Sequence, residues 1–283
     1  MMVQSDVANA VKQLARRAQA ANPSAGHEYM GGDGLLYCSV CGEPVQQRIR
    51  QNIFFPDGIV PCQCRCVREQ IARDLAEEGR RRAQEYAAEL RRKGFADPAY
   101  ARQTFARDNG SSPAARAAAE WYVDNFPQLK RAGKGLLMMG GTGTGKTFYA
   151  CCIANALMDA GVSAWVTTVQ PLLRMAGDFS TAEEIFARIK SVDLLVLDDF
   201  GACQSGARNV ELLFEIVDTR YRCGLPLVVT TNLRPVDMRS APIELERIYS
   251  RVKQMCVNEH SPIIMDGADL RELAARDNFK KGK

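Results

Sequence analysis

The sequence has no run of about 18 apolar residues, the shortest stretch that crosses a bilayer as a helix. Its first stretch, MMVQSDVANAVKQLARR, also lacks the apolar segment and the small-residue cleavage site of a secretory signal. No internal repeat or low-complexity tract is visible apart from the basic end at 280–283. The net charge of +4 is too small to indicate nucleic-acid binding by itself. These absences predict a cytoplasmic globular protein with no membrane association.

What the sequence does contain is enough apolar material for a sizeable core, together with many cysteines. The chain has 283 residues, of which 46% are hydrophobic, so we expect more than one average domain and fewer than three. Ten cysteines without a secretory signal indicate metal ligands or buried thiols rather than disulfides, because the cytosol keeps thiols reduced. Half of them are clustered: Cys38, Cys41, Cys62, Cys64 and Cys66.

The composition changes twice along the chain and divides it into three predicted parts. Residues 1–66 hold the cysteine cluster. Residues 67–94 are rich in Ala, Glu, Arg and Leu and contain no Pro, which predicts a long exposed connector helix. Over 95–283, short buried apolar segments alternate with helical periodicity, which predicts an α/β domain with a parallel sheet flanked by helices. We expect strands at 135–140, 163–169, 192–200 and 225–232, and helices at 146–161, around 170–190 and at 208–223.

The strongest motif is a complete phosphate-binding loop between a predicted strand and a predicted helix. It consists of Gly140, Gly141, Thr142, Gly143, Thr144, Gly145, Lys146 and Thr147. The glycines allow backbone N–H groups to surround a phosphate at the amino terminus of the helix, where the helix dipole favours negative charge. We expect Lys146 to neutralise the β- and γ-phosphates and Thr147 to place its hydroxyl on Mg²⁺. The sequence therefore predicts a nucleotide-binding site.

Two further strands are predicted to end in polar side chains at the same edge of the sheet. Asp198 and Asp199 follow the apolar run 194–197, and Asn232 ends the strand predicted at 225–232. Because parallel strands present their carboxyl ends to one edge, we expect these side chains beside the phosphate loop. Asp198 is predicted to hold Mg²⁺ through water, and Asp199 to orient or deprotonate the attacking water. Asn232 is predicted to contact the γ-phosphate or that water.

These motifs together resemble those of the AAA+ ATPases of the DnaC/IstB type. The resemblance is carried by GGTGTGKT, DLLVLDDFG and VVTTN at these separations, and by the carboxyl-terminal stretch ELERIYSRVKQMC…GADLR. The entry stretch with Pro98, Tyr100, Thr104 and Phe105 is similar to the segment that precedes the ATPase core in that family. The similarity covers about residues 95–272, and the cysteine module extends it toward DnaC-type helicase loaders.

The resemblance implies roles for three arginines and a choice of nucleotide. Arg251 looks like the finger that reaches the γ-phosphate on a neighbouring subunit, with Arg247 as the nearby alternative. Such an arginine raises turnover about 10³-fold or more in related NTPases. Arg271 falls where the family carries an arginine that acts on the phosphates of its own subunit. The resemblance therefore implies ATP as the nucleotide and self-association through the AAA+ interface.

The cysteine cluster predicts a structural zinc site. Cys38 and Cys41 form a C-x-x-C knuckle, and four thiolates satisfy tetrahedral Zn²⁺ without leaving a position open for chemistry. The resemblance to helicase loaders favours Cys38, Cys41, Cys62 and Cys64 as ligands, with Cys66 as a spare that could replace Cys62 or Cys64. The intervening stretch QQRIRQNIFFPDGIV predicts a hairpin. Cys151 and Cys152 are expected to pack as small apolar residues.

Two regions carry candidate nucleic-acid contacts. Basic and aromatic residues together suit single-stranded DNA, although the same side chains also suit a protein partner or a core. In the cysteine module these are Arg48, Arg50, Arg65, Arg68, Phe54 and Phe55. In residues 172–190, where helicase loaders carry a DNA-contacting insertion, they are Arg174, Phe179, Arg188 and Lys190. The amphipathic stretch SDVANAVKQLARRAQAA is expected to dock on a partner.

The resemblance implies an ATP-dependent loader of the replicative DNA helicase onto single-stranded DNA, with ATP binding and hydrolysis acting as a switch. ATP, Mg²⁺ and Zn²⁺ are the expected cofactors, and the resemblance implies that the amino-terminal module contacts the helicase. Two alternatives remain open. One is a transposition helper ATPase of the IstB type, and the other is a zinc-stabilised nucleotide-binding adaptor without useful turnover.

Overall fold

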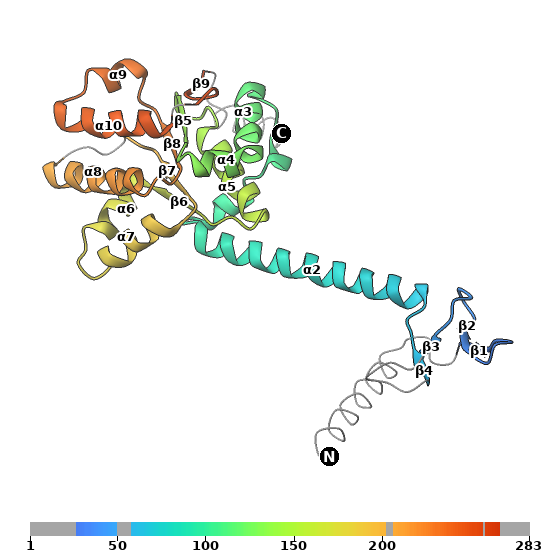
Figure 1. The fold of residues 1–283 in the computed structure, drawn as a ribbon. Coiled ribbons are helices and arrows are strands. Elements are labelled where there is room, and N and C mark those ends of the chain that lie inside the picture. The colour runs from blue at the N-terminus through green and yellow to red at the C-terminus, as the bar shows by residue number, and fades with distance from the viewer. Residues whose placement is uncertain (1–26, 50–57, 202–205, 257, 267–283) are drawn as a thin grey trace, which may run out of the picture. The chain divides into compact units, whose positions relative to one another are not determined.

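A computed structural model describes residues 27–49, 58–201, 206–256 and 258–266 of the chain (Figure 1). Contacts divide the chain into two compact units, Met1–Arg82 and Ala83–Lys283. The boundary lies inside one helix, α2 (Arg65–Gly94), whose composition favours a helix along its whole length. The predicted connector helix is thus present and begins two residues earlier than expected. Among the described residues, no helix combines the length and apolar character needed to cross a bilayer.

The first unit consists of two small antiparallel pairs followed by the beginning of α2. Strands β1 (Glu28–Met30) and β2 (Leu36–Cys38) form one pair, and β3 (Gln46–Ile49) and β4 (Gly58–Pro61) form the other. The β3–β4 pair confirms the predicted hairpin, whose turn lies outside the described residues. Among the residues that the structure describes in this unit, the buried cluster consists of Cys38, Val45, Cys64 and Val67. So small an apolar core calls for further stabilisation, such as a metal.

The second unit is built on a five-stranded parallel sheet with the order β6-β7-β8-β5-β9 (Figure 1). All its strand pairs are parallel, as the predicted alternation of strands and helices requires. The strands are β5 (Leu136–Gly140), β6 (Ala164–Thr168), β7 (Leu194–Asp198), β8 (Leu227–Thr231) and β9 (Ile263–Met265). The first four match the predicted strands, whereas β9 was not predicted because it is only three residues long.

Helices cover both faces of this sheet, and each face has its own apolar cluster. Alternate residues of β5 show the division, because Leu137 and Met139 belong to one cluster and Leu136 and Met138 to the other. One cluster includes side chains of α3 (Pro113–Asp124), α4 (Phe126–Arg131) and α5 (Lys146–Asp159). The other includes those of α6 (Val169–Ala176), α7 (Ala182–Ser191), α8 (Ala207–Arg222), α9 (Pro235–Arg239) and α10 (Ile243–Cys256).

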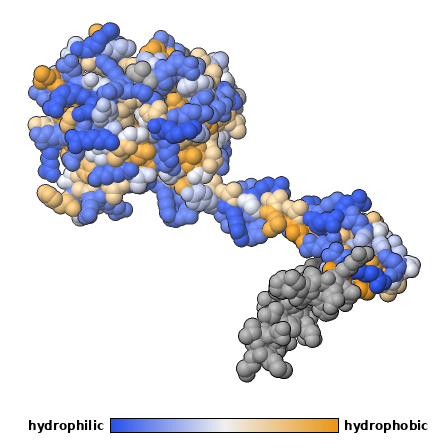
Figure 2. Space-filling view, viewed as in Figure 1, coloured by the Kyte–Doolittle hydropathy of each residue, from blue (hydrophilic) through white to orange (hydrophobic). Residues whose placement is uncertain are grey.

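Two short 3-10 helices, η1 (Pro98–Arg102) and η2 (Phe105–Arg107), connect α2 to α3. The predicted helical stretch at 170–190 is divided into α6 and α7, because α6 ends at Ala176 and Gly177 is its C-cap. The visible surface around the sheet is mainly hydrophilic, with apolar side chains scattered over it (Figure 2). This burial pattern leaves the carboxyl edge of the sheet as the place where polar groups gather.

Candidate functional site

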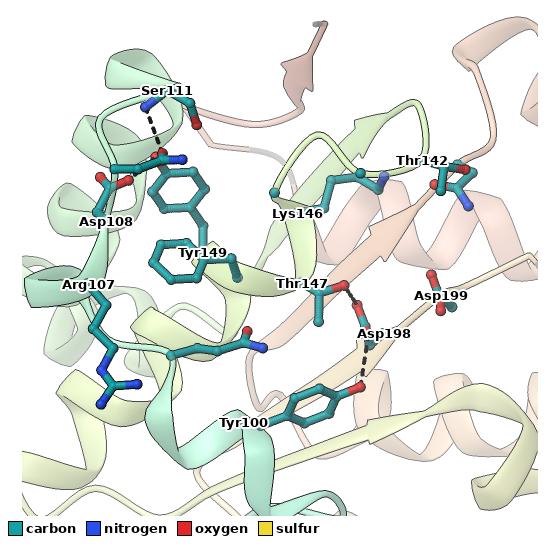
Figure 3. Close-up of a pocket in the computed structure, with 16 residues that line it drawn as sticks. Tyr100, Arg107, Asp108, Ser111, Thr142, Lys146, Thr147, Tyr149, Asp198 and Asp199 are labelled. Carbon is teal, nitrogen blue, oxygen red and sulfur yellow. Dashed lines mark hydrogen bonds between the residues drawn. The ribbon is translucent and has the colours of Figure 1, made fainter. Parts of the chain in front are cut away.

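A cavity of about 580 Å³ lies at the carboxyl ends of β5, β7 and β8 (Figure 3). The phosphate loop and the residues that follow these strands form one wall, and the segment between η1 and α3 forms another. Its lining residues are Tyr100, Gln103, Arg107, Asp108, Asn109, Ser111, Thr142, Gly143, Gly145, Lys146, Thr147, Phe148, Tyr149, Asp198, Asp199 and Asn232. The structure therefore brings the polar residues predicted at the carboxyl ends of three strands to one cavity.

The phosphate loop connects β5 directly to α5, and its glycines are needed for its shape. A Cβ atom at Gly140 would lie 2.1 Å from the carbonyl oxygen of Met265 in β9. Gly145 precedes α5 with a φ of 95°, in the left-handed region that favours glycine. The Nζ of buried Lys146 donates hydrogen bonds to the carbonyl oxygens of Gly140 (3.0 Å) and Gly141 (2.6 Å). The loop thus holds a cation beside backbone N–H groups at a helix amino terminus, which suits a phosphate.

The carboxylate of Asp198, which the sequence predicts to hold Mg²⁺, lies among three hydroxyl groups. Its Oδ1 accepts a hydrogen bond of 2.8 Å from the Thr147 hydroxyl and a second from the Thr230 hydroxyl. Its Oδ2 lies 3.5 Å from the hydroxyl of Tyr100 (Figure 3). Burial raises the pKa of Asp198, and the two threonine hydroxyls oppose that shift. A carboxylate beside a threonine hydroxyl is an all-oxygen set that fits Mg²⁺.

Asp199 and Asn232 complete the polar edge. Asp199 has a φ of 53°, the left-handed region, which Asp tolerates better than most residues. Its backbone N–H donates a hydrogen bond of 3.1 Å to the Thr230 hydroxyl, so the turn after β7 is fixed to β8. Both side chains are exposed and line the cavity. The arrangement places an ionisable carboxylate and an amide where a water molecule can approach a bound phosphate.

The wall between η1 and α3 was not predicted from motif spacing. Asp108, whose side chain is 1% exposed, pairs with Arg116 at 3.2 Å and accepts a hydrogen bond of 3.1 Å from the Tyr149 hydroxyl. The first contact fixes Asp108 to α3, and the second fixes it to α5, where Figure 3 shows Asp108 beside Tyr149. The family resemblance marked Tyr100 in this stretch, but no spacing in the sequence indicated that its hydroxyl approaches Asp198.

The predicted arginine fingers do not line this cavity. Arg251 pairs with Asp218 at 2.8 Å, and its guanidinium lies over the rings of Phe214 and Tyr221. Arg247 lies over Phe214 at 4.7 Å and lines a second cavity of about 530 Å³ between α8 and the start of α10. Arg271 lies outside the described residues. The two described arginines thus share one face of the α8–α10 pair.

The structure brings together a group of four cysteines that differs at one position from the predicted one. The sulfurs of Cys38, Cys41, Cys64 and Cys66 all lie within 4.8 Å of one another. Cys62 lies outside this group, one residue after the end of β4. Its N–H donates to the carbonyl of Val45, and its sulfur donates to the carbonyl of Pro44 at 3.3 Å. Cys66 takes its place, as the sequence alternative allowed.

The start of α2 explains why Cys66 joins the group. The helix begins at Arg65, so Cys64 immediately precedes it and Cys66 lies in its first turn. Backbone N–H groups of Glu43 and Cys66 lower the pKa of the Cys41 thiol to about 6. A hydrogen bond with Cys41 raises the pKa of Cys66 to about 12. Four convergent sulfurs, one of which ionises readily, form a set that fits Zn²⁺.

Several candidate DNA-contacting side chains make contacts with other residues of the protein. Arg188 lies 4.0 Å from the ring centre of Trp165 and donates a hydrogen bond to the carbonyl of Lys93, so it connects α7 to the end of α2. In the first unit, Arg48 donates to the carbonyl of Asp33 at 2.7 Å, and Arg68 pairs with Glu43 at 3.0 Å. Arg50, Phe54 and Phe55 lie outside the described residues, as does the amphipathic stretch predicted to dock on a partner.

Other candidates in the region of α6 and α7 remain accessible. Arg174 and Lys190 are exposed, and Phe179, in the connection between the two helices, is 98% exposed. Phe186, by contrast, packs against the core. Cys151 and Cys152 are buried in α5, and burial raises the pKa of both thiols, as expected for packing residues. The exposed Arg174, Phe179 and Lys190 are thus accessible to a partner, whereas Phe186 and the two thiols are packed inside the protein.

The parallel sheet, the phosphate loop and the acidic end of β7 define an AAA+ P-loop ATP-binding fold. Residues 125–240 match the family described as IstB-like ATP binding protein. This match confirms the resemblance of the core to DnaC/IstB-type AAA+ ATPases.

Named relatives agree with this assignment. The chain is 29% identical over 147 residues to Rv3427c of Mycobacterium tuberculosis (strain ATCC 25618 / H37Rv), named for ATP binding in an insertion sequence, and covers 57% of it. It is 28% identical over 181 residues to the replicative helicase loader DnaI of Bacillus subtilis (strain 168), and covers 58% of it. These matches span 50% and 59% of this chain. A crystal structure of DnaI matches 62% of this chain and 95% of that one, with 27% identity and a TM-score of 0.50.

Proposed function

We propose that this protein is a cytoplasmic, ATP-dependent loader of the replicative DNA helicase onto single-stranded DNA, in which the ATPase core acts as a switch. The observation that carries the proposal is the combination of two sites in one chain. A nucleotide cavity lies in an AAA+ core, and four convergent cysteines lie in a separate unit that precedes it. The similarity to DnaI over 181 residues supports this reading.

The cavity residues have separate tasks in binding and hydrolysing ATP. Lys146 and the N–H groups of the loop bind the β- and γ-phosphates, while Thr147 and Asp198 hold Mg²⁺, which neutralises phosphate charge. Asp199 orients the attacking water and accepts its proton, and Asn232 positions that water or the γ-phosphate. These assignments rest on the shared cavity of all five side chains.

Self-association completes the site in this proposal. Arg251, or Arg247 beside it, reaches the γ-phosphate bound by a neighbouring subunit, since neither lines the cavity of its own chain. Arg271 acts on the phosphates within its own subunit. A charge supplied across an interface makes hydrolysis depend on assembly.

The amino-terminal module holds a structural metal and binds a protein partner in this proposal. We assign Cys38, Cys41, Cys64 and Cys66 as Zn²⁺ ligands, which add to the small apolar cluster found among the described residues of this unit. The module, which we place at residues 1–66 before the connector at 67–94 and the ATPase domain at 95–283, binds the helicase. Arg174, Phe179 and Lys190 bind single-stranded DNA through charge and stacking.

Co-purification with a bacterial replicative helicase tests this function. Full-length protein is mixed with the helicase from the same genome in the presence of ATP, and a chain lacking residues 1–66 provides the comparison. We expect the full-length chain to retain helicase and the shortened chain to lose it. A shortened chain that still binds ATP shows that the core has remained folded. Full-length protein that retains no helicase under ATP contradicts the loader function.

A second candidate is a transposition helper ATPase of the IstB type. It is favoured by the match of residues 125–240 to the IstB-like family and by the similarity to Rv3427c. Capture of a transposase rather than the helicase supports this candidate. ATP hydrolysis measured with and without single-stranded DNA separates both functions from a nucleotide-binding adaptor, because an adaptor shows no turnover in either condition.

A further inference from the structure

Asn155 is a buried polar residue in α5 that has no part in phosphate binding. It is 1% exposed, and a buried amide in a helix is unfavourable unless its hydrogen bonds are satisfied. Its Oδ1 accepts a hydrogen bond of 2.9 Å from Nε of Arg91 in α2. Its Nδ2 donates to the carbonyl oxygens of Tyr100 (3.0 Å) and Gln103 (2.9 Å), and to that of Cys151 in its own helix (3.1 Å). One side chain thus joins three segments.

The chemistry of these partners requires an amide at position 155. Arg91 offers only donors, whereas the backbone carbonyls of Tyr100 and Gln103, like that of Cys151, offer only acceptors, so the neighbours determine the orientation of the amide. An aspartate keeps the contact with Arg91 and loses both carbonyl contacts. A leucine fills a similar volume and loses all of them. The residue therefore connects a cation on one side to two carbonyls on the other.

On the Arg91 side, the contacts fix the end of α2 to the AAA+ core. Arg91 also pairs with Asp159 at the end of α5, at 2.5 Å. The N–H of Ala96 donates to the carbonyl of Val166 in β6 at 3.2 Å. Gly94 lies so close to β6 that a Cβ atom there would be 2.4 Å from the carbonyl oxygen of Ala164. The last turn of α2 is thus part of the packed core.

On the carbonyl side, the contacts lead to the nucleotide cavity. Tyr100 and Gln103 both line it, and the Tyr100 hydroxyl lies 3.5 Å from Oδ2 of Asp198. Asp198 in turn accepts a hydrogen bond from Thr147 (Figure 3). The backbone of η1 is therefore fixed by Asn155, while a side chain of the same helix reaches the magnesium-binding carboxylate.

We propose that Asn155 is a positioning residue that couples occupancy of the nucleotide cavity to the end of α2. The inference rests on the proposed binding of ATP and Mg²⁺. A ligand that orders η1 on the cavity wall also orders the Asn155 amide and, through it, the Arg91 turn of α2. Coupling of this kind is reciprocal, so loosening the end of α2 weakens nucleotide binding by the same factor.

Hydrogen exchange of the full-length protein tests this coupling. Exchange at residues 88–96 is measured without ligand, with ATP and Mg²⁺, and with ATP and a chelator. Arg91→Gln breaks the charged contact at a partly exposed position and leaves the carbonyl contacts of Asn155 in place. Arg92→Gln is the matched control, because it makes the same change in charge at the next position, where the side chain is exposed. Asn155→Asp tests the other side of the amide.

In the unaltered protein and in Arg92→Gln, we expect ATP with Mg²⁺ to slow exchange at residues 88–96. In Arg91→Gln we expect this protection to disappear and the dissociation constant for ATP with Mg²⁺ to rise about fivefold, at the low end of ordinary coupling factors. Asn155→Asp should lose the protection as well, and Arg91→Gln decides the question if that variant does not fold. Protection that persists in Arg91→Gln, or is absent from a wild-type chain that binds ATP, contradicts the coupling. A wild-type chain that binds no ATP contradicts the proposed function instead.

Discussion

The Thr147 hydroxyl donates a hydrogen bond of 2.8 Å to Oδ1 of Asp198, across 51 positions of sequence. This bond connects the first turn of α5 to the end of β7. It brings together one residue from the phosphate loop and one from the acidic strand end, at the wall of a single cavity. Both side chains belong to the set that would hold Mg²⁺, so the protein keeps these two residues close together through their own contact.

Thr147→Ala is expected to weaken nucleotide binding only where Mg²⁺ contributes. Loss of a hydrogen bond to a charged group corresponds to about a tenfold rise in the dissociation constant for ATP with Mg²⁺. Binding of ATP in the presence of a chelator should change little. Titration of a fluorescent ATP analogue under both conditions measures this difference. Thr147→Ser, which keeps the hydroxyl, is the matched control, and an equal loss in both conditions would count against a magnesium role.

Replacing single cysteines distinguishes the structural group of sulfurs from the sequence prediction. We expect Cys66→Ser to lose bound zinc, because it removes one of four convergent sulfurs. Cys62→Ser should keep one zinc ion per chain, because the sulfur of Cys62 donates a hydrogen bond to the carbonyl of Pro44 instead of joining the group. Metal content of the purified full-length variants, measured by mass spectrometry, gives the answer. The reverse result would restore the ligand set that includes Cys62.

The sequence was sufficient for features that depend on contiguous residues and on topology. The phosphate loop is one unbroken motif, and Asp198 and Asn232 follow buried strands whose parallel pairing brings them to the same edge. The choice between Cys62 and Cys66 was harder, because it depends on where α2 begins. A helix start at Arg65 rather than Val67 places Cys66 in the first turn.

Features that depend on tertiary contacts could not be predicted from the spacing of residues in the sequence. Tyr100 and Asp198 are separated by 98 positions, and no periodicity relates them. Arg188 has the same residue type and helix pattern as a DNA-contacting arginine, but the ring of Trp165 and the carbonyl of Lys93 engage it within the protein. Only the packing of β6 against α7 and the end of α2 distinguishes these two roles.

Mixing two inactive variants tests the trans-acting arginine. Arg251→Ala lacks the proposed finger but keeps a complete nucleotide cavity, and Asp199→Asn lacks the carboxylate that activates water but keeps Arg251. Each variant should therefore be inactive alone. If Arg251 acts on a neighbouring subunit, equimolar mixing should restore ATP hydrolysis at mixed interfaces.

The controls for this mixture are Arg247→Ala and a thermal melt. Arg251 pairs with Asp218, which is buried, so the melt must show that Arg251→Ala remains folded. Asp218 also pairs with Arg222 at 2.7 Å, which leaves its carboxylate a partner. A folded Arg251→Ala variant with full activity alone, combined with an inactive Arg247→Ala, would transfer the role to Arg247.

Arg220 stabilises the amino ends of β7 and β8 beside the end of α7, and its replacement by lysine is expected to lower the stability of the AAA+ unit. Its side chain is 0% exposed and donates hydrogen bonds to the backbone carbonyls of Ile189, Val192, Asp193 and Pro226. Burial lowers its pKa to about 10, which leaves the guanidinium charged near neutral pH. A lysine starts from a lower pKa and offers one nitrogen, so burial discharges it more easily and most of the carbonyls lose their donor.

We expect Arg220→Lys to lower the free energy of unfolding of the AAA+ unit by about 3 kcal/mol, the cost of leaving buried groups without charged partners. Arg222→Lys, on the same helix but with an exposed side chain, should change it by less than about 1 kcal/mol. Urea unfolding followed by tryptophan fluorescence reports on this unit, because both tryptophans, Trp121 and Trp165, lie in it. Equal midpoints and slopes for the two variants would show that the four carbonyl contacts contribute little, and that α7 and β8 are held by their apolar packing.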